Sequence, residues 1–454
     1  MGSAARAGLD LALPQQLTVI ALCALTAFVS HLALAVFNDG VRPFMLDFVQ
    51  GRSTRAATAA VSFGLSAGFV FGLGAPMALA SGVLNPWLLF LPTDVLGLLA
   101  PRKWLAPLLG AGWGALVVFG LGGANELAHD LPVDFLTAMQ QMSTPILFLF
   151  TLFPVLAVVR QFGPLRGAVV GVVELALVVL TLKLWPNMFA GALAMAVGVL
   201  MLIGFAVTAD VRRRKAERAE RAERAERAER SDSDPVEADA DDPMASLFSA
   251  SAARLRRHLP LFMLLGAGIC VLAQLKVFGG GEATSFLIAK GQYAEAAQVD
   301  FYRMFGFLPL IATTALASGA YGIVGFTLAY PIGYLLPNPL LAAVAGAAVF
   351  AVEVLALSSI GRVLGRLPSV RDSSEHLRAA IGEALGLAIL FGSLLAANQM
   401  GGGLAILICG GLYLLNEATG RPVVRMAAAP AAVLVGGVVL NLLYWLDLFA
   451  PVKG

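Results

Sequence analysis

The pentapeptide ALASG occupies residues 78–82 of this chain and occurs again at residues 315–319, an offset of 237 residues. Other landmarks recur at nearly the same spacing: VFNDG (36–40) matches VFGGG (277–281), and Pro92 matches Pro331. Paired hydrophobic repeats are a common construction of transporters, whose substrate site tends to lie between the two halves. The repetition therefore predicts two versions of one unit.

The composition indicates a membrane protein. Hydrophobic residues make up 59% of the 454 residues, and charged residues only 13%. Such values are typical of polytopic membrane proteins, and the net charge of +2 argues against a nucleic-acid partner. The first apolar stretch (17–37) lacks a strongly basic leader and is followed by further apolar segments, which favours a first transmembrane helix over a cleaved signal peptide.

The charges gather in a linker between the repeats. Residues 210–257 hold 12 Lys/Arg and 12 Asp/Glu, including the run RAERAERAERAER, whose alternating signs favour a solvated helix. We therefore predict membrane repeat 1 over residues 1–209, a charged cytoplasmic linker over 210–257, and membrane repeat 2 over 258–454.

Each half contains about seven hydrophobic segments, and a segment of roughly 20 residues spans the hydrocarbon core as a helix. The third and tenth are the weakest of the fourteen. The segments are 16–37, 56–81, 83–100, 104–123, 137–159, 166–184, 188–209, 259–277, 301–320, 322–337, 340–360, 377–397, 403–416 and 427–448.

Basic loops predict the orientation of these segments. With the linker in the cytoplasm and seven spans per half, the basic loops fall inside and the acidic stretches 126–134 and 282–300 fall outside. An odd number of spans per repeat inverts the second repeat relative to the first. The predicted fold is therefore an all-α polytopic membrane protein with two inverted-topology repeats and external termini.

The third and tenth segments carry prolines at matching places, in LNPWLLFLPTDVLGLL (84–99) and GFTLAYPIGYLLPNP (325–339). Proline removes a backbone donor and interrupts the helical ladder, and paired broken helices point to a transporter site. Ordinary kinked helices are the alternative. The first candidate binding residues lie on or beside these segments: Asp94, Thr93, Thr313 and Thr314. Asp94 either binds a coupling cation or proton, or caps the broken helix.

A second group of candidate residues comes from two other motifs. Asn38, Asp39 and Arg42 belong to NDGVRP, where Asp39 and Arg42 form an ion pair or Arg42 contacts an anionic substrate or a lipid head group. Gln140 and Gln141 suit a sugar or another polyhydroxylated solute, and equally suit hydrogen bonds between helices.

Chemistry other than transport has little support in the sequence. Glu174, Glu353 and Glu417 are intramembrane or membrane-edge carboxyl groups, any of which could carry a proton, and the pattern does not choose among them. No nucleophile and base pair, metal-ligand motif or nucleotide-binding loop occurs in the sequence. We therefore predict no catalytic residue, no metal and no cofactor.

Long motifs along nearly the whole chain resemble the YhfT-like family of bacterial membrane proteins. The resemblance implies a multi-pass protein of the bacterial inner membrane with a transport function, and it brings no established substrate or site residues. The motifs are VFNDGVRP, LNPWLLFLPTDVLGLLA, LPVDFL, FLPLIATTALASGAYGIVGFT, LPNP, LGRLPSVR, LLNEATGRPV and NLLYWLDLF.

A shorter stretch, GVRPFMLDFVQG (40–51), is similar to the ascorbate-type membrane subunits of sugar phosphotransferase systems. That resemblance implies inverted repeats, a homodimer and an elevator motion. The chain shows no attached phosphoryl-carrying domain, so phosphorylation-coupled uptake would need a separate partner.

The leading hypothesis is a secondary transporter of a small polar solute, anionic or sugar-like, coupled to a cation or a proton and surrounded by membrane lipids. Two alternatives stay open at this point. One is a phosphotransferase-like permease that needs soluble phosphoryl donors. The other is an intramembrane lipid-handling protein or enzyme, suggested by the carboxyl groups without obvious partners.

Overall fold

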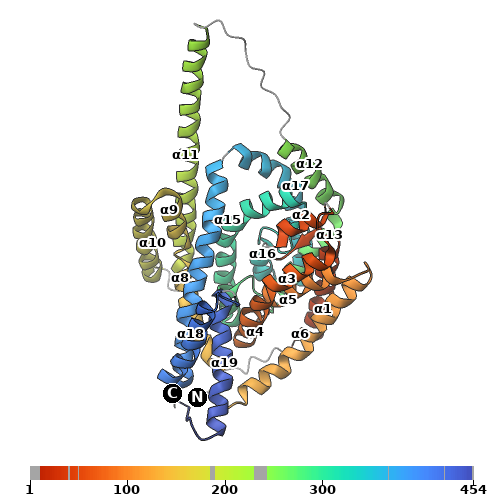
Figure 1. Cartoon of the computed structure of the whole chain (residues 1–454), viewed down its shortest axis with the longest axis vertical. Coiled ribbons are helices and arrows are strands. Elements are labelled where there is room, and N and C mark those ends of the chain that lie inside the picture. Colours follow the sequence, from red (N-terminus) through yellow and green to blue (C-terminus); the bar gives the residue numbers. More distant parts are fainter. Residues whose placement is uncertain are drawn as a thin grey trace.

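The computed structural model describes residues 11–38, 41–49, 51–184, 190–229, 243–366, 368–423 and 425–451. Almost all of the described chain is helical (Figure 1). The first half runs α1 (Leu13–His31), β1 (Ala35–Val36), α2 (Arg42–Val49), α3 (Arg55–Phe69), the π-helical turn η2 (Val70–Gly74), α4 (Ala75–Ser81), α5 (Pro86–Leu99), α6 (Leu105–His129), α7 (Phe135–Met139), the 3-10 turn η3 (Gln140–Met142), α8 (Ser143–Phe150), α9 (Phe153–Phe162), α10 (Pro164–Leu184) and α11 (Ala190–Glu229).

The second half begins with α12. It consists of α12 (Pro243–Arg257), α13 (Leu259–Gln274), α14 (Glu282–Ala289), α15 (Tyr293–Ser318), β2 (Tyr321–Gly322), α16 (Ala329–Leu335), α17 (Pro339–Arg366), α18 (Pro368–Ala418) and α19 (Arg425–Trp445).

Within the described residues, seven helices are long and apolar enough to cross a membrane. An eighth is present if α12 and α13, which meet at a bend of 68°, count as one span. The prediction of an all-α polytopic membrane protein is therefore confirmed. The seven stretches are Leu13–His31, Leu105–Gly123, Pro164–Leu184, Leu193–Glu223, Pro339–Arg362, Ala379–Ala418 and Ala427–Trp445.

The fourteen hydrophobic segments are thus not fourteen long helices. The third segment forms the 14-residue helix α5, and the tenth forms the seven-residue helix α16. The fifth segment, expected as one span, is divided into α7, η3, α8 and α9. The segments 377–397 and 403–416 lie in one element, α18, which is kinked where Gly401 and Gly402 leave helical geometry.

The expected break at Pro92 is wrong, because α5 continues through this residue. Proline cannot donate to the carbonyl four residues earlier, which here belongs to Leu88. The indole Nε1 of Trp113, on α6, donates to that carbonyl at 2.9 Å. A side chain from the neighbouring helix therefore replaces the missing backbone bond. The tenth segment, in contrast, has a non-helical approach to α16 with positive φ at Gly325 and Thr327.

Replacing Trp113 by phenylalanine should uncover the Leu88 carbonyl while keeping most of the aromatic volume. A buried acceptor left without a donor costs about 1–3 kcal/mol. We expect Trp113→Phe to unfold at a lower temperature in detergent than the wild-type protein. An unchanged melting temperature would show that the indole bond does not support α5.

Close helix packing holds each half together. α1 packs along α6, and α13 packs along α17. A Cβ atom on Gly110 would lie 2.2 Å from the Cys23 carbonyl oxygen, and one on Gly346 would lie 2.2 Å from the Gly266 carbonyl oxygen. Only glycine allows backbones to approach this closely.

Two short pairings join the halves in the interior. β1 pairs in parallel with β2, and an isolated parallel bridge links Leu84 to Phe278. The Ile323 N–H donates to the Val36 carbonyl at 3.1 Å, and the Leu84 N–H donates to the Val277 carbonyl at 2.8 Å. β1 follows α1 and meets β2, which precedes α16. In the same way, Phe278 follows α13 and meets Leu84, which precedes α5.

Figure 1 shows two groups of helices. α9, α10, α11, α18 and α19 lie on the left, and α1, α3, α5, α6, α13 and α17 lie on the right. α15 contacts α11 and α18 of the left group, α17 of the right group, and α16.

The first part of the linker is helical, as its alternating charges indicate. α11 runs without interruption from the apolar segment to Glu229, and Arg213 pairs with Glu217 at 2.9 Å. The expected boundary at residue 210 therefore falls inside one helix. The acidic stretch 231–242 lies outside the described residues.

Candidate functional site

The candidate site is the place where β1 and β2 meet. We call it the central junction and define it by β1, β2 and the buried side chains of Asp94, Arg42 and Glu353. These three residues come from α5, α2 and α17, so both halves contribute. Irregular backbone at membrane depth is tolerated only where protein or a water-filled cavity supplies hydrogen-bond partners. The junction is therefore the place where polar side chains are needed.

Asp94 supplies acceptors for the loop after β1. Its Oδ2 accepts from the backbone N–H groups of Phe37 at 2.8 Å and Asn38 at 3.0 Å, and its Oδ1 accepts from the Ser30 hydroxyl at 2.8 Å. The side chain is 0% exposed. The alternative hypothesis predicted that Asp94 caps the broken helix to which it belongs. The structure corrects this, because Asp94 lies within a continuous α5 and caps a different segment.

Asn38 extends this network toward α3. Its backbone N–H is bound by Asp94, and its side-chain Nδ2 donates to the Ser66 hydroxyl at 3.0 Å. The structure thus brings together two of the residues predicted for the site.

Arg42 crosses from the first half to the second. It is only 2% exposed, and its Nη1 donates to the hydroxyl of Thr314 on α15. A Cβ atom on Gly322 of β2 would lie 2.8 Å from the Arg42 Nη2, so the guanidinium lies against the second strand. The expected Asp39–Arg42 pair falls partly outside the described residues, because Asp39 is not among them.

Glu353 is the second carboxyl group of the central junction. It accepts from the Tyr321 hydroxyl and from the Phe326 N–H, the latter at 3.0 Å. Sequence reasoning found no partner for this carboxyl group, because Tyr321 lies 32 residues earlier and in a strand. The sequence feature that pointed to this partner was Tyr321 itself, a tyrosine inside an otherwise apolar segment, since buried tyrosine hydroxyls usually have a hydrogen-bond partner.

A further polar cluster, missed at the level of sequence, surrounds the Leu84–Phe278 bridge. The Tyr334 hydroxyl donates to the Asp300 carboxylate at 2.8 Å and accepts from the Gly280 N–H at 2.8 Å. Arg303 pairs with Asp300 at 3.2 Å. Tyr334 lies three residues after Pro331, the proline that matches Pro92, so its position was the available signal. α5 thus binds the loop that follows α1 and β1, and α16 binds the loop that follows α13.

The remaining predicted residues lie differently. The buried Thr93 hydroxyl donates to the Phe90 carbonyl within α5 at 2.8 Å, and the side chain of Thr313 lies outside the described part of α15. Gln140 donates to the Ala80 carbonyl at 3.3 Å, which agrees with the alternative that this amide forms a hydrogen bond between helices. Gln141 lines a separate pocket of about 580 Å³. The structure therefore divides the predicted set between the central junction and this pocket.

The pocket has both apolar and polar walls, and three of its lining residues carry amide side chains. Gln141 is joined there by Asn398 and Gln399 of α18, beside the kink at Gly401 and Gly402. Asp134 and Thr137 also line the pocket, and they bond to each other, because the Thr137 hydroxyl donates to Asp134 at 2.6 Å. The open amides can donate and accept hydrogen bonds, which suits a hydroxylated solute.

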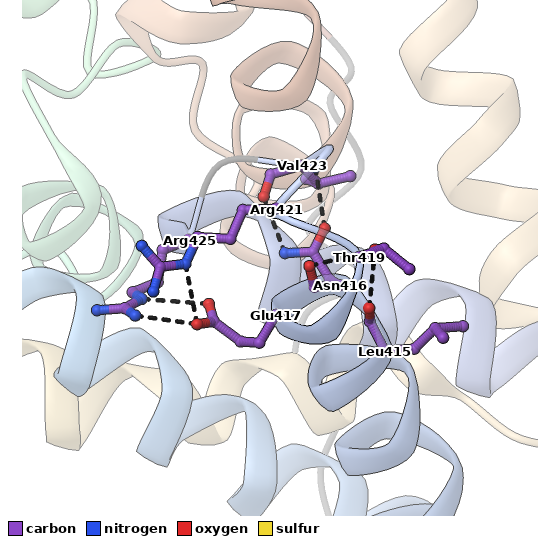
Figure 2. A network of polar contacts seen from close by, with 7 residues as sticks. All are labelled: Leu415, Asn416, Glu417, Thr419, Arg421, Val423 and Arg425. Atoms are coloured by element: carbon purple, nitrogen blue, oxygen red, sulfur yellow. Dashed lines mark hydrogen bonds and ion pairs between the residues drawn. The ribbon is translucent and has the colours of Figure 1, made fainter.

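The NEATGRP turn is structural (Figure 2). The Asn416 side chain exchanges two hydrogen bonds of 2.9 Å with the backbone of Val423. Glu417 pairs with Arg421 and Arg425, both at 2.9 Å. The hydrogen bond that Arg425 donates to Glu417 raises the pKa of Arg425. Glu417 is therefore held as a carboxylate in an ion pair, which makes it a poor proton carrier.

No group of three or more His, Cys, Asp or Glu side chains among the described residues is placed to hold a metal ion. The three cysteines are free and buried.

The YhfT family model, whose description is "protein of unknown function", matches residues 15–449. The chain is 39% identical over 449 residues to the uncharacterized protein YhfT of Escherichia coli strain K12, covering 96% of this chain and 99% of that protein. No solved structure matches the chain. The resemblance carried by the long sequence motifs is confirmed.

Proposed function

The chain belongs to the YhfT family, and from this premise we propose that it is a secondary transporter of a small polar solute in the bacterial inner membrane. The observation that carries the proposal is the parallel pairing of β1 and β2. Three buried ionisable residues border this pairing: Asp94 binds the loop after β1, Arg42 lies against β2, and Glu353 accepts from Tyr321 of β2. Ionisable groups at membrane depth are costly and mark solute or ion pathways.

The matched contacts of the two halves support inverted repeats. α1 packs along α6 and touches α5, while α13 packs along α17 and touches α16. The two interior pairings exchange corresponding strands between the halves. A substrate site between such repeats can open to either side as their packing changes.

We further propose an elevator-like motion. The group with α1, α5, α6, α13, α16 and α17 carries the central junction, and the strand pairings bind its two halves together. The group with α9, α10, α11, α18 and α19 is the natural frame against which it moves. A homodimer through that frame remains part of this proposal.

The proposed solute class is based on the polar side chains of the central junction and of the pocket at Gln141. Arg42 offers a cation to an anionic group at the central junction, and Gln141, Asn398 and Gln399 offer amides to hydroxyl groups in the pocket. We therefore propose a hydroxylated acid or sugar-like solute that enters from the pocket.

Uptake from a defined mixture tests the proposal. Liposomes containing the purified protein would be incubated with sugars, sugar acids and small carboxylic acids, and their contents would be identified by mass spectrometry. We expect one chemical class to accumulate above protein-free liposomes, chemically unmodified. Uptake equal to that of protein-free liposomes under inward proton and sodium gradients would contradict transport.

The same measurement separates the alternatives. A phosphotransferase-like permease would yield a phosphorylated product, and only when soluble phosphoryl donors are supplied. A lipid-handling enzyme would alter a lipid of the liposome and move no solute.

A further inference from the structure

Glu174 lies at the middle of a lipid-facing helix but points inward. It is the eleventh of the 21 residues of α10. The buried residues of this helix are Gly167, Val170, Glu174 and Thr181, which form one stripe, whereas most of the remaining apolar side chains are exposed. Glu174 itself is 2% exposed. The stripe faces α9 and α11, which both pack against α10.

The surroundings of the carboxyl group offer no partner among the described residues. Neither oxygen accepts a hydrogen bond from a side chain or backbone group there. The backbone of α11 lies directly against it, because a Cβ atom on Gly198 would be 1.9 Å from the Glu174 Oε1. The same Cβ would be 2.8 Å from Pro154 of α9, a residue without an N–H group. A water between these neighbours would have only the carboxyl group itself to bind.

The charged residues of the three helices are engaged or far along the axis. Arg160 of α9 pairs with Glu383, and Asp210 of α11 accepts from the Ser369 N–H at 3.0 Å. On α10, Arg166 stacks on two phenylalanine rings, and Lys183 lies in the last turn. At 1.5 Å per residue, Arg166 and Lys183 are about 12 and about 13 Å from Glu174 along the helix.

An ionised carboxylate cannot persist in such a place, since an unpaired buried charge neutralises by taking up a proton. We propose that Glu174 is a proton-binding site of the membrane region and that it carries the coupling proton of the transport cycle. The coupling role rests on the proposed transport function. The proton-binding role does not, because it follows from burial and the lack of partners alone.

Infrared spectroscopy of the purified protein tests proton binding without any transport. At neutral pH, the wild-type protein should show a carbonyl stretch of a protonated carboxylic acid that is absent from Glu174→Gln. The matched control is Glu383→Gln, whose carboxyl group is exposed and paired with Arg160, and which should leave the band unchanged. Identical wild-type and Glu174→Gln spectra would overturn the proposal.

Reconstituted protein then tests coupling. Glutamine mimics the protonated carboxyl group in size and charge, so a purely structural role predicts normal transport by Glu174→Gln. We expect solute accumulation driven by a pH gradient to fall on the order of tenfold or more, whereas solute exchange at equal pH persists. Accumulation by this variant equal to that of the wild-type protein would overturn the coupling role. If the wild-type protein moves no solute, the coupling role fails with the proposed function, and the infrared band still decides proton binding.

Discussion

Replacing Asp94 by alanine is expected to prevent stable folding of the membrane region. The substitution leaves the N–H groups of Phe37 and Asn38 without their acceptor inside the protein, and the Ser30 hydroxyl keeps only the Ala35 carbonyl. A buried polar group that loses its partner costs about 1–3 kcal/mol, so the two N–H groups alone cost about 2–6 kcal/mol. Thermal unfolding in detergent should show a lower melting temperature and poor recovery of the monodisperse protein.

Asparagine at the same position gives the matched comparison. Its Oδ1 can accept from both N–H groups in place of the Asp94 Oδ2, and its Nδ2 can donate to the Ser30 hydroxyl. Ser30 can then donate to the Ala35 carbonyl, 3.1 Å away. Asp94→Asn should therefore fold and yet lose solute uptake, because the ionisable group is gone. Uptake by Asp94→Asn equal to that of the wild-type protein would remove this carboxyl group from the mechanism.

Replacing Arg42 by alanine is the second substitution with a large expected effect. It removes the buried cation that donates to the Thr314 hydroxyl and lies against Gly322 of β2. Losing one member of a buried charged network costs about 3–5 kcal/mol. We expect a large loss of thermal stability together with loss of uptake, and a partial rescue by Arg42→Lys.

The matched control for Arg42 is Arg52, which pairs with Asp47 at 3.2 Å with its side chain 62% exposed. Exposed pairs contribute about 0–1 kcal/mol. Arg52→Ala should therefore retain stability and uptake. Equal behaviour of the two alanine variants would contradict a special role of the buried guanidinium.

The sequence predicted the class of fold well, because hydrophobicity at membrane depth permits few alternatives. It also placed Asp94, Asn38, Arg42 and Thr314 among the candidate residues, and the structure joins them in two contacts, Asp94 with Asn38 and Arg42 with Thr314. The proline-containing stretch 84–99 and the residues just before 325–339 drew attention to Asp94 and Thr314, and the NDGVRP motif drew attention to Asn38 and Arg42.

Local sequence could not predict which groups replace the backbone hydrogen bonds that are lost at the prolines and irregular turns. Proline at position 92 indicates a break, and the compensating donor comes from Trp113, 21 residues later and on another helix. In the same way, the partners of Glu353 come from the strand and loop at Tyr321 and Phe326. Such bonds depend on tertiary contacts, which single-helix patterns do not encode.

The pocket at Gln141 was likewise beyond a sequence argument. Asn398 and Gln399 lie more than 250 residues later, and they face Gln141 beside the non-helical geometry at Gly401 and Gly402. A run of three glycines signals an irregular bend and does not give its direction.

The most direct test of the account asks whether the central junction opens to each side of the membrane. A cysteine placed at Thr314 would be reacted with a membrane-impermeable maleimide from either face, with the buried native Cys23, Cys270 and Cys409 as the background. Alternating access predicts labelling from both faces, in proportions that change when the transported solute is added. Labelling from neither face, or from one face under every condition, would contradict a solute pathway through the junction.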